Sequence, residues 1–128
     1  MGKSQQIKGK RGELEVVMLL KRYGFDARRG QVWNGEPDIV SDLPIHFEVK
    51  RHEDLKISEW FKQAENDSGW KYPSVVFRQS RKAWRVVIRA CDLIALVADK
   101  NIITSNVLVE MYFSDFLRVL KEVDNYER

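Results

Sequence analysis

The segment Ile45–Lys50 constrains the fold of this chain more than any other stretch. Apolar and polar side chains alternate along it, the apolar set being Ile45, Phe47 and Val49 and the polar set His46, Glu48 and Lys50. Because successive residues of a β-strand point to opposite faces, this alternation predicts a strand with one face in the core and one charged face. Such a strand needs neighbouring strands to satisfy its backbone hydrogen bonds, and the rest of the chain must supply them.

Further strands and two helices are predicted around this segment. Short apolar runs bounded by Gly, Pro or Asn-Gly turn signals predict strands at Phe25–Arg29, Asp38–Ser41, Ile45–Lys50, Ser74–Phe77 and Trp84–Arg89. Apolar residues at helical spacing predict a helix from Gly9 to Tyr23, stopped by Gly24. A second helix is expected from the N-cap Ser58 to Asp67, closed by Gly69. We therefore expect an α/β fold.

The C-terminal part contains two similar stretches, 87–96 and 110–119. Each is predicted to be a strand that runs into a short helix, the second helix capped by Ser114. Two copies are too few for a repeat architecture. We interpret residues 90–128 as a structural extension of the domain.

Length and composition favour one folded domain over residues 1–128, with residues 1–8 as a possible flexible basic tail. The chain is 44% hydrophobic and 32% charged, a composition that differs from that of disordered chains. Its apolar runs, such as Val16–Leu20, are far shorter than the ~20 residues of a membrane span, and no signal peptide is recognised. We expect a cytoplasmic protein (host cytoplasm if phage-encoded) with no membrane partner, and a buried structural thiol at Cys91.

Charge is segregated along the chain. Residues 1–30 carry eight Lys or Arg against three acids, and residues 78–89 carry five against none. The centre, 31–77, has nine acids against five bases. This pattern suits a protein that grips a polyanion at its edges and holds cations at one central spot, although an ordinary charged surface explains it equally well.

The acidic centre predicts a pair of facing carboxylates. If 42–44 forms a three-residue hairpin loop, Ser41 pairs with Ile45 and Asp38 lies directly opposite Glu48. Two facing carboxylates repel each other unless a cation binds between them. A shift of one residue in register would break this alignment.

Glu13 is a third candidate carboxylate. On a helical wheel, Val16, Val17 and Leu20 fall within about 60° of it, so Glu13 lies on the inward face of the first predicted helix. Glu15 falls on the opposite side and is expected to point to water. Glu13 is thus interpreted as a residue that reaches the carboxylates of the hairpin, with a capping or core role as the alternative.

Carboxylate oxygens are suitable ligands for Mg²⁺, for which Mn²⁺ is a substitute. Lys50 shares a strand face with Glu48 and is placed to act on a water or on the charge of a phosphorane. These residue types together suit metal-assisted hydrolysis of a phosphodiester.

The motif Pro37-Asp38, separated by nine residues from Glu48-Val49-Lys50, resembles the signature of the PD-(D/E)xK nucleases. The glycine-bearing basic stretch 8–13 resembles the first helix of archaeal-type Holliday-junction resolvases, and small phage nucleases of this superfamily are also similar. The resemblance covers about residues 7–90. It implies a restriction-endonuclease-like core, a central mixed sheet flanked by helices, and a homodimer that cuts branched DNA.

The resemblance also implies roles for individual residues. The implied metal ligands are Glu13, Asp38, Glu48 and the backbone carbonyl of Val49. Lys50 would act on the water, and Gln63 resembles an accessory glutamine. The expected contacts to DNA are made by Lys3, Lys8, Lys10, Arg11, Arg28, Arg29, Arg81 and Lys82.

Two other functions stay open at this point. One is a nicking or duplex-cutting nuclease of the same superfamily, and the other is a DNA-binding module without catalysis. His46 and His52 are expected to be solvated or hydrogen-bonded rather than metal ligands. Trp33 is expected to be packed, with base stacking as the alternative, and Trp60 and Phe61 to lie in the core or at a dimer interface.

Overall fold

The computed structural model describes the backbone of residues 3–102 and 107–127 and the side chains of residues 9–102 and 107–124. The elements are, in chain order, α1 (Lys3–Arg22), β1 (Ala27–Arg29), η1 (Val32–Asn34), β2 (Ile39–Ser41), β3 (Ile45–Arg51), α2 (Ile57–Asp67), β4 (Tyr72–Arg78), β5 (Arg85–Arg89), α3 (Ala90–Ala98), β6 (Leu108–Tyr112) and α4 (Phe113–Glu127). All five predicted strands are present. The two predicted C-terminal strand–helix pairs are also confirmed, as β5–α3 and β6–α4.

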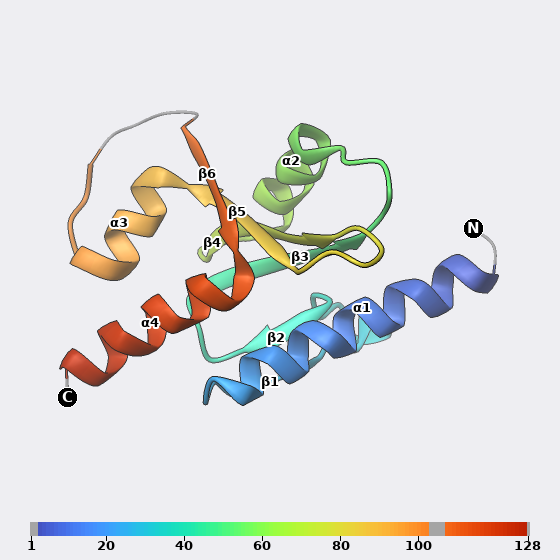
Figure 1. Cartoon of the computed structure of the whole chain (residues 1–128), viewed down its shortest axis with the longest axis horizontal. Helices are drawn as coiled ribbons and strands as arrows, with labels where there is room; N and C mark the ends of the chain where they lie inside the picture. Colours follow the sequence, from blue (N-terminus) through green and yellow to red (C-terminus); the bar gives the residue numbers. More distant parts are fainter. Residues whose placement is uncertain (1–2, 103–106, 128) are drawn as a thin grey trace.

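The centre of the molecule is a four-stranded sheet in the order β3-β4-β5-β6 (Figure 1). Strands β3 and β4 run parallel, joined by the crossover helix α2, and the other neighbours are antiparallel. Strands β1 and β2 form a separate antiparallel ribbon. The predicted class, an α/β fold with a central mixed sheet flanked by helices, is confirmed.

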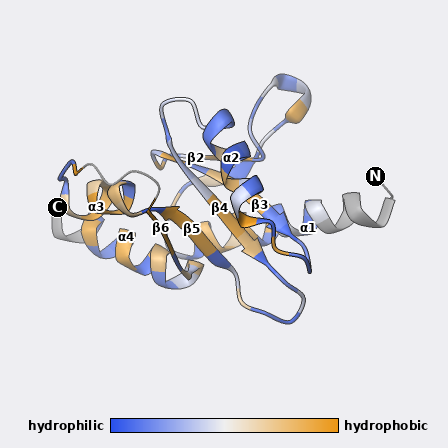
Figure 2. Ribbon diagram, turned by 90° about the horizontal axis from the view of Figure 1, so that it is seen from above, coloured by the Kyte–Doolittle hydropathy of each residue, from blue (hydrophilic) through white to orange (hydrophobic). Residues whose placement is uncertain are grey.

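Two apolar clusters cover the two faces of the sheet. The larger contains Val16 and Leu20 of α1, Phe116 of α4 and the side chains of one face of the strands. The smaller lies under α2 and includes Trp60 and Phe61, as predicted for a core position. Apolar colouring accordingly concentrates on the strands and inner helix faces in Figure 2. Helices on both faces are what a parallel strand pair requires.

The predicted hairpin between β2 and β3 is wrong. Strand β2 pairs with β1, in a register that sets Ala27 against Ser41. Strand β3 instead pairs with β4, with Glu48 against Val75. The run from Ile45 to Glu48 is buried, because this strand is covered on both faces and takes a parallel partner. The connection 42–44 therefore links two sheets, and Asp38 is not a ladder partner of Glu48.

The helix boundaries differ in part from the prediction. Helix α1 begins at Lys3, six residues before the predicted start, and ends before Gly24, whose φ is +89°. Helix α2 begins at Ile57, so Ser58 is not its N-cap, but it ends at Asp67 as predicted. Helix α4 begins at Phe113, which places Ser114 inside it. No helix in the described part of the chain is long and apolar enough to cross a bilayer.

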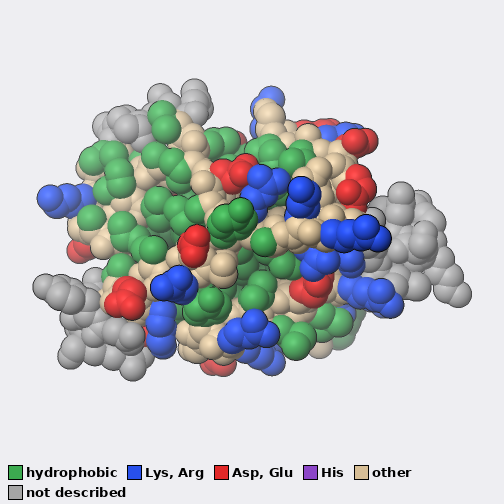
Figure 3. Space-filling view, in the orientation of Figure 1, with side chains coloured by type: hydrophobic (Ala, Val, Ile, Leu, Met, Phe, Trp, Pro, Cys, Tyr) green, Lys and Arg blue, Asp and Glu red, His purple; other side chains and the backbone are tan. Residues whose placement is uncertain are grey.

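The sheet ends in two different edge strands, β3 and β6. Strand β6 pairs only with β5 among the described residues, and it exposes apolar side chains at Leu108 and Tyr112, next to exposed Val107. Hydrophobic side chains gather over α3 and β6 on the face seen in Figure 3. Strand β3, at the other edge, borders the charged site described next.

Candidate active site

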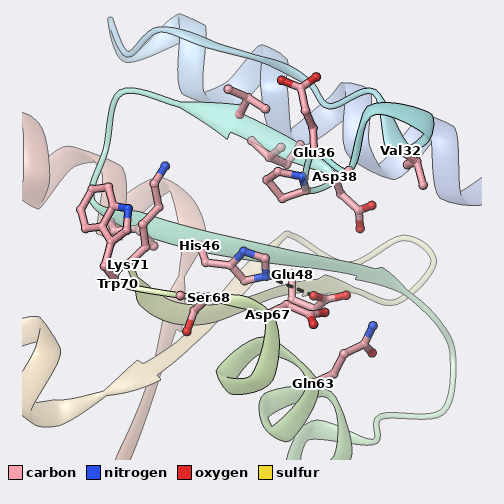
Figure 4. Close-up of a pocket in the computed structure, with 16 residues that line it drawn as sticks. Val32, Glu36, Asp38, His46, Glu48, Gln63, Asp67, Ser68, Trp70 and Lys71 are labelled. Atoms are coloured by element: carbon pink, nitrogen blue, oxygen red, sulfur yellow. Dashed lines mark hydrogen bonds and ion pairs between the residues drawn. The ribbon is translucent and has the colours of Figure 1, made fainter.

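A pocket of about 650 Å³ lies between the β1–β2 ribbon, the edge of β3 and the end of α2 (Figure 4). Asp38 enters it from the start of β2 and Glu48 from β3. Gln63 of α2 lines the same pocket, as does His46. Two of the three predicted carboxylates, Asp38 and Glu48, therefore meet the predicted glutamine in one cavity, whereas Glu13 does not line it.

Glycine at position 30 allows the close approach that places Asp38. The backbone N–H of Gly30 donates to the carbonyl oxygen of Asp38 over 2.8 Å. A Cβ at Gly30 would stand 1.6 Å from the carbonyl oxygen of Pro37, which no side chain could tolerate. Close backbone approach is a common reason for glycine in a strand pair.

Glu48 is buried and held from two sides. Its Oε1 lies 3.3 Å from Nε2 of His46, and its Oε2 lies 3.6 Å from Nζ of Lys50. Nζ of Lys50 also donates to Oε1 of Gln63 over 3.1 Å. His46 is thus hydrogen-bonded, as predicted, and Gln63 orients the lysine.

Glu13 lies on the inward face of α1, beside buried Val16 and Leu20, as the wheel predicted. Its Oε1 accepts hydrogen bonds from Nε and Nη2 of Arg29, at 3.0 and 2.9 Å. Arg29 is therefore a partner of the acidic site, in addition to the DNA contact that the sequence suggested for it.

The electrostatics of the three carboxylates are coupled. Burial raises the pKa of Asp38, and the nearby charge of Glu48 raises it further. Burial also raises the pKa of Glu13, and the charge of Asp38 adds to this in spite of Arg29. Groups that raise one another's pKa in this way are costly to ionise together. A cation at this point would relieve the cost.

The carboxylates of the site are few but sufficient donors for a divalent ion. The described residues contain no group of three or more His, Cys, Asp or Glu side chains that could by itself hold a metal ion. Glu13 is engaged by Arg29, which leaves Asp38 and Glu48 as the side-chain donors among the three predicted carboxylates. Mg²⁺ is commonly held by one or two carboxylates, with water and substrate phosphate completing its shell. The residues fit such an ion.

The backbone of β3 adds a third oxygen. The carbonyl of Pro44 accepts from Tyr72, and the N–H of His52 donates to Arg78, so even-numbered residues of this strand bond to β4. In a parallel pair the bonding residues alternate. The register is continuous from Ile45 to Arg51, so the carbonyl of Val49 is directed to the open edge.

Several predicted DNA contacts lie away from the pocket or have protein partners. Arg28 is paired with Glu36, Nη2 to Oε2, over 2.6 Å, and its hydrogen bond lowers the pKa of Glu36 to about 2. Of the residues predicted to contact DNA, Lys10 and Arg11 on α1 and Arg81 and Lys82 in the β4–β5 loop are exposed. The side chains of Lys3 and Lys8 lie outside the described residues.

Three other expectations were wrong. Glu15 does not point freely to water, because its Oε1 accepts from Nη1 of Arg78 over 2.7 Å. Trp33 is not packed, since 81% of it is exposed. Cys91 is only half-buried, and its Sγ lies 3.6 Å from Oδ1 of Asp92.

The sequence did not point to three further residues that line the pocket: Asp67, at the end of α2, and Trp70 and Lys71, in the turn between α2 and β4. They come close because Ile45 pairs with Tyr72, which brings the starts of β3 and β4 together. The helical pattern of α2 between two strands was the available signal for a parallel crossover.

No protein-family model matches the sequence, and no curated protein matches it. Among solved structures, the chain is similar to a Holliday junction resolvase of the archaeal hyperthermophile Archaeoglobus fulgidus. The sequence identity is 21%, the match covers 85% of this chain and 87% of that chain, and the TM-score is 0.47. At this level of similarity, function has to be inferred from the residues of the site itself.

Proposed function

We propose that this chain is a Mg²⁺-dependent endodeoxyribonuclease that hydrolyses phosphodiester bonds, with branched DNA such as a Holliday junction as its substrate. The observation that carries the proposal is that Asp38, Glu48 and Gln63 line one open pocket, while Nζ of Lys50 lies 3.6 Å from Glu48 and donates to Gln63. A structural role would not gather carboxylates that raise one another's pKa. A phosphate-binding module would not place them where phosphates must approach.

Each residue of the site has a role in the proposed reaction. Asp38, Glu48 and the Val49 carbonyl would hold the ion, which when bound polarises the phosphate and lowers the pKa of a water molecule. Lys50 is placed to stabilise negative charge that develops on the phosphate, and Gln63 fixes its ammonium group by the 3.1 Å hydrogen bond. Glu13 adds a third carboxylate to this acidic site, and the hydrogen bond from Arg29 sets the position of the Glu13 side chain.

Positive side chains would hold the DNA around this pocket. The exposed side chains of Lys10 and Arg11 on α1 and of Arg81 and Lys82 in the β4–β5 loop are available for backbone phosphates. Symmetric cutting of a junction needs two active sites, so we propose a homodimer. The second candidate, a nicking or duplex-cutting nuclease, shares the same site and differs only in substrate.

The test is a cleavage assay with Mg²⁺ on four matched DNA substrates: a four-way junction, a flap, a duplex and a single strand. We expect cleavage of the junction to be fastest and to stop with a chelator. Lys50→Ala should lose cleavage but retain Mg²⁺ binding in a calorimetric titration. Lys62→Ala removes an exposed lysine of the same helix as Gln63 and is the matched control.

The outcomes separate the candidates. Cleavage of the duplex at the same rate as the junction would favour the second candidate. DNA binding without cleavage of any substrate, by wild-type protein with either Mg²⁺ or Mn²⁺, would leave a binding module as the function.

A further inference from the structure

Trp70 is an exposed tryptophan in the wall of the pocket that contains Asp38 and Glu48. It follows α2, in the turn that leads into β4, and 81% of the residue is exposed. Figure 4 places its indole ring at the end of the pocket away from Gln63. A tryptophan usually gains stability by burial, and an indole left open in the wall of a pocket has its apolar surface available to a ligand.

Lys71 gives this end of the pocket a positive charge. Its Nζ lies 5.7 Å from the centroid of the Trp70 ring and 3.5 Å from the carbonyl oxygen of Ser41. The ammonium lies over one face of the ring, so a base would stack on the opposite face, with its phosphate reaching the charge. Asp67 also lines the pocket, and its carboxylate favours a phosphate on the Lys71 side rather than near α2.

We propose that Trp70 is a stacking platform for one unpaired base of the strand that is cut at Asp38 and Glu48. The inference rests on the proposed nuclease function and narrows its substrate class. Inside a duplex both faces of a base are covered by its neighbours, so the indole can act only where a base is unstacked. The substrate is then DNA that can present an unstacked base next to the cut, as a flap or a bulge does directly and a branch point does when a base pair at it opens.

The chain offers a matched control in Trp33, which is also 81% exposed. It lies on η1, and its neighbours Val32 and Gly35 line the pocket, but Trp33 is not among the described residues that do. Both tryptophans are largely solvated, so replacing either should leave the thermal unfolding midpoint close to that of the wild type. A difference in DNA affinity between the two variants would therefore reflect where each tryptophan lies and not a change in stability.

The experiment measures DNA affinity by fluorescence anisotropy in the presence of a chelator, where no metal-dependent cleavage occurs. Three duplexes of one sequence are compared: fully paired, with one bulged adenosine, and with the same bulge lacking the base. Wild type should bind the bulged adenosine about tenfold more tightly than the abasic bulge. Trp70→Ala should bind both bulges equally, Trp70→Phe should keep part of the preference, and Trp33→Ala should keep all of it.

The inference and the proposed function fail in different ways. If Trp70→Ala keeps the full preference while the wild type still cuts DNA with Mg²⁺, the stacking platform is wrong and the nuclease stands. If Trp70→Ala keeps the preference but changes the molar mass measured by light scattering, Trp70 belongs to a protein interface and the inference is again overturned. If wild type neither binds nor cuts any DNA, the proposed function is wrong and the inference falls with it.

Discussion

The backbone N–H of Gly30 donates a hydrogen bond to the carbonyl oxygen of Asp38 over 2.8 Å. The same contact brings the carbonyl oxygen of Pro37 within 1.6 Å of where a Cβ at position 30 would stand. The obstacle is backbone, which cannot rotate aside as a flexible side chain can. The placement of Asp38, directly before β2, thus depends on the absence of a side chain at Gly30, directly after β1.

Gly30→Ala should therefore push β1 and β2 apart and displace Asp38. We expect a loss of about 1–3 kcal/mol in the free energy of unfolding, measured in urea, together with a loss of cleavage. Gly9→Ala is the control, because nothing lies within 4 Å of a Cβ there. Alanine in the helix at position 9 should stabilise the protein by about 0.5–1 kcal/mol, and a similar gain at position 30 would contradict the steric argument.

Asp38→Asn and Glu48→Gln should each slow cleavage by about a hundredfold or more, since a bound metal contributes several kcal/mol to stabilising the transition state. DNA affinity should be kept or improved, because each change removes a charge that repels phosphate. Single-turnover rates and anisotropy titrations measure the two effects separately. Near wild-type cleavage by both variants would exclude the proposed metal site.

Glu13→Gln and Glu15→Gln separate two neighbouring acids of α1. Glu13→Gln should cripple turnover, because it changes the charge next to Asp38. Glu15→Gln should leave turnover unchanged and lower stability by up to about 1 kcal/mol, through its partly exposed ion pair with Arg78. Turnover rates and urea midpoints of both variants test this, and reversed sensitivities would mean that the helix face is wrongly assigned.

The raised pKa of Asp38 predicts a pH-dependent effect on stability in the absence of metal. Burial first, and then the charge of Glu48, make the folded protein bind the Asp38 proton more tightly than the unfolded chain does. The free energy of unfolding should therefore fall as pH rises from the ordinary carboxyl pKa through the raised one. Asp38→Asn should be more stable than wild type at pH 7, and the gain should vanish in acid.

Urea unfolding at several pH values, with a chelator, measures this difference. Asp42→Asn removes an exposed carboxylate from the connection after β2 and should follow the wild type. Added Mg²⁺ should stabilise the wild type at pH 7 but not Asp38→Asn. A destabilised Asp38→Asn protein at pH 7 would contradict the electrostatic reading of the site.

Arg81 and Lys82 test how DNA is held. Both are exposed in the loop between β4 and β5, where Arg81 has a φ of 62°. Replacing both with Ala should weaken binding to junctions of different sequence equally and flatten the plot of log affinity against log salt by up to about two units. An unchanged slope, or a loss that depends on sequence, would place the DNA contacts elsewhere.

The sequence predicted elements better than it predicted their pairing. The strands could be predicted from short apolar runs and from the alternation of apolar and polar residues. The inward face of α1 could be predicted from the helical spacing of apolar residues around Glu13. Pairing is decided by distant parts of the chain, and nothing local in 38–50 shows that β1 has already taken the hydrogen-bonding edge of β2. The hairpin was the simplest local choice, and it was wrong.

The site was only partly predictable for the same reason. Asp38, Glu48 and Lys50 could be selected because their types and spacing carry the chemistry. Arg29 looked like a DNA contact, and its bond to Glu13 depends on how α1 packs against β1. Trp70 gave no signal at all, since its place in the pocket depends on the parallel pairing of β3 with β4.

The unlike edges of the sheet limit how copies of this chain could assemble. The β3 edge borders the charges of Asp38 and Glu48, whereas the β6 edge is apolar at Leu108 and Tyr112. If two copies pair along β6, each has used the one apolar sheet edge among its described residues, so the assembly closes at two and cannot grow into a filament. Seven strand spacings of about 4.8 Å would then separate the two β3 strands by about 34 Å. The width of the sheet would set the distance between the two cuts.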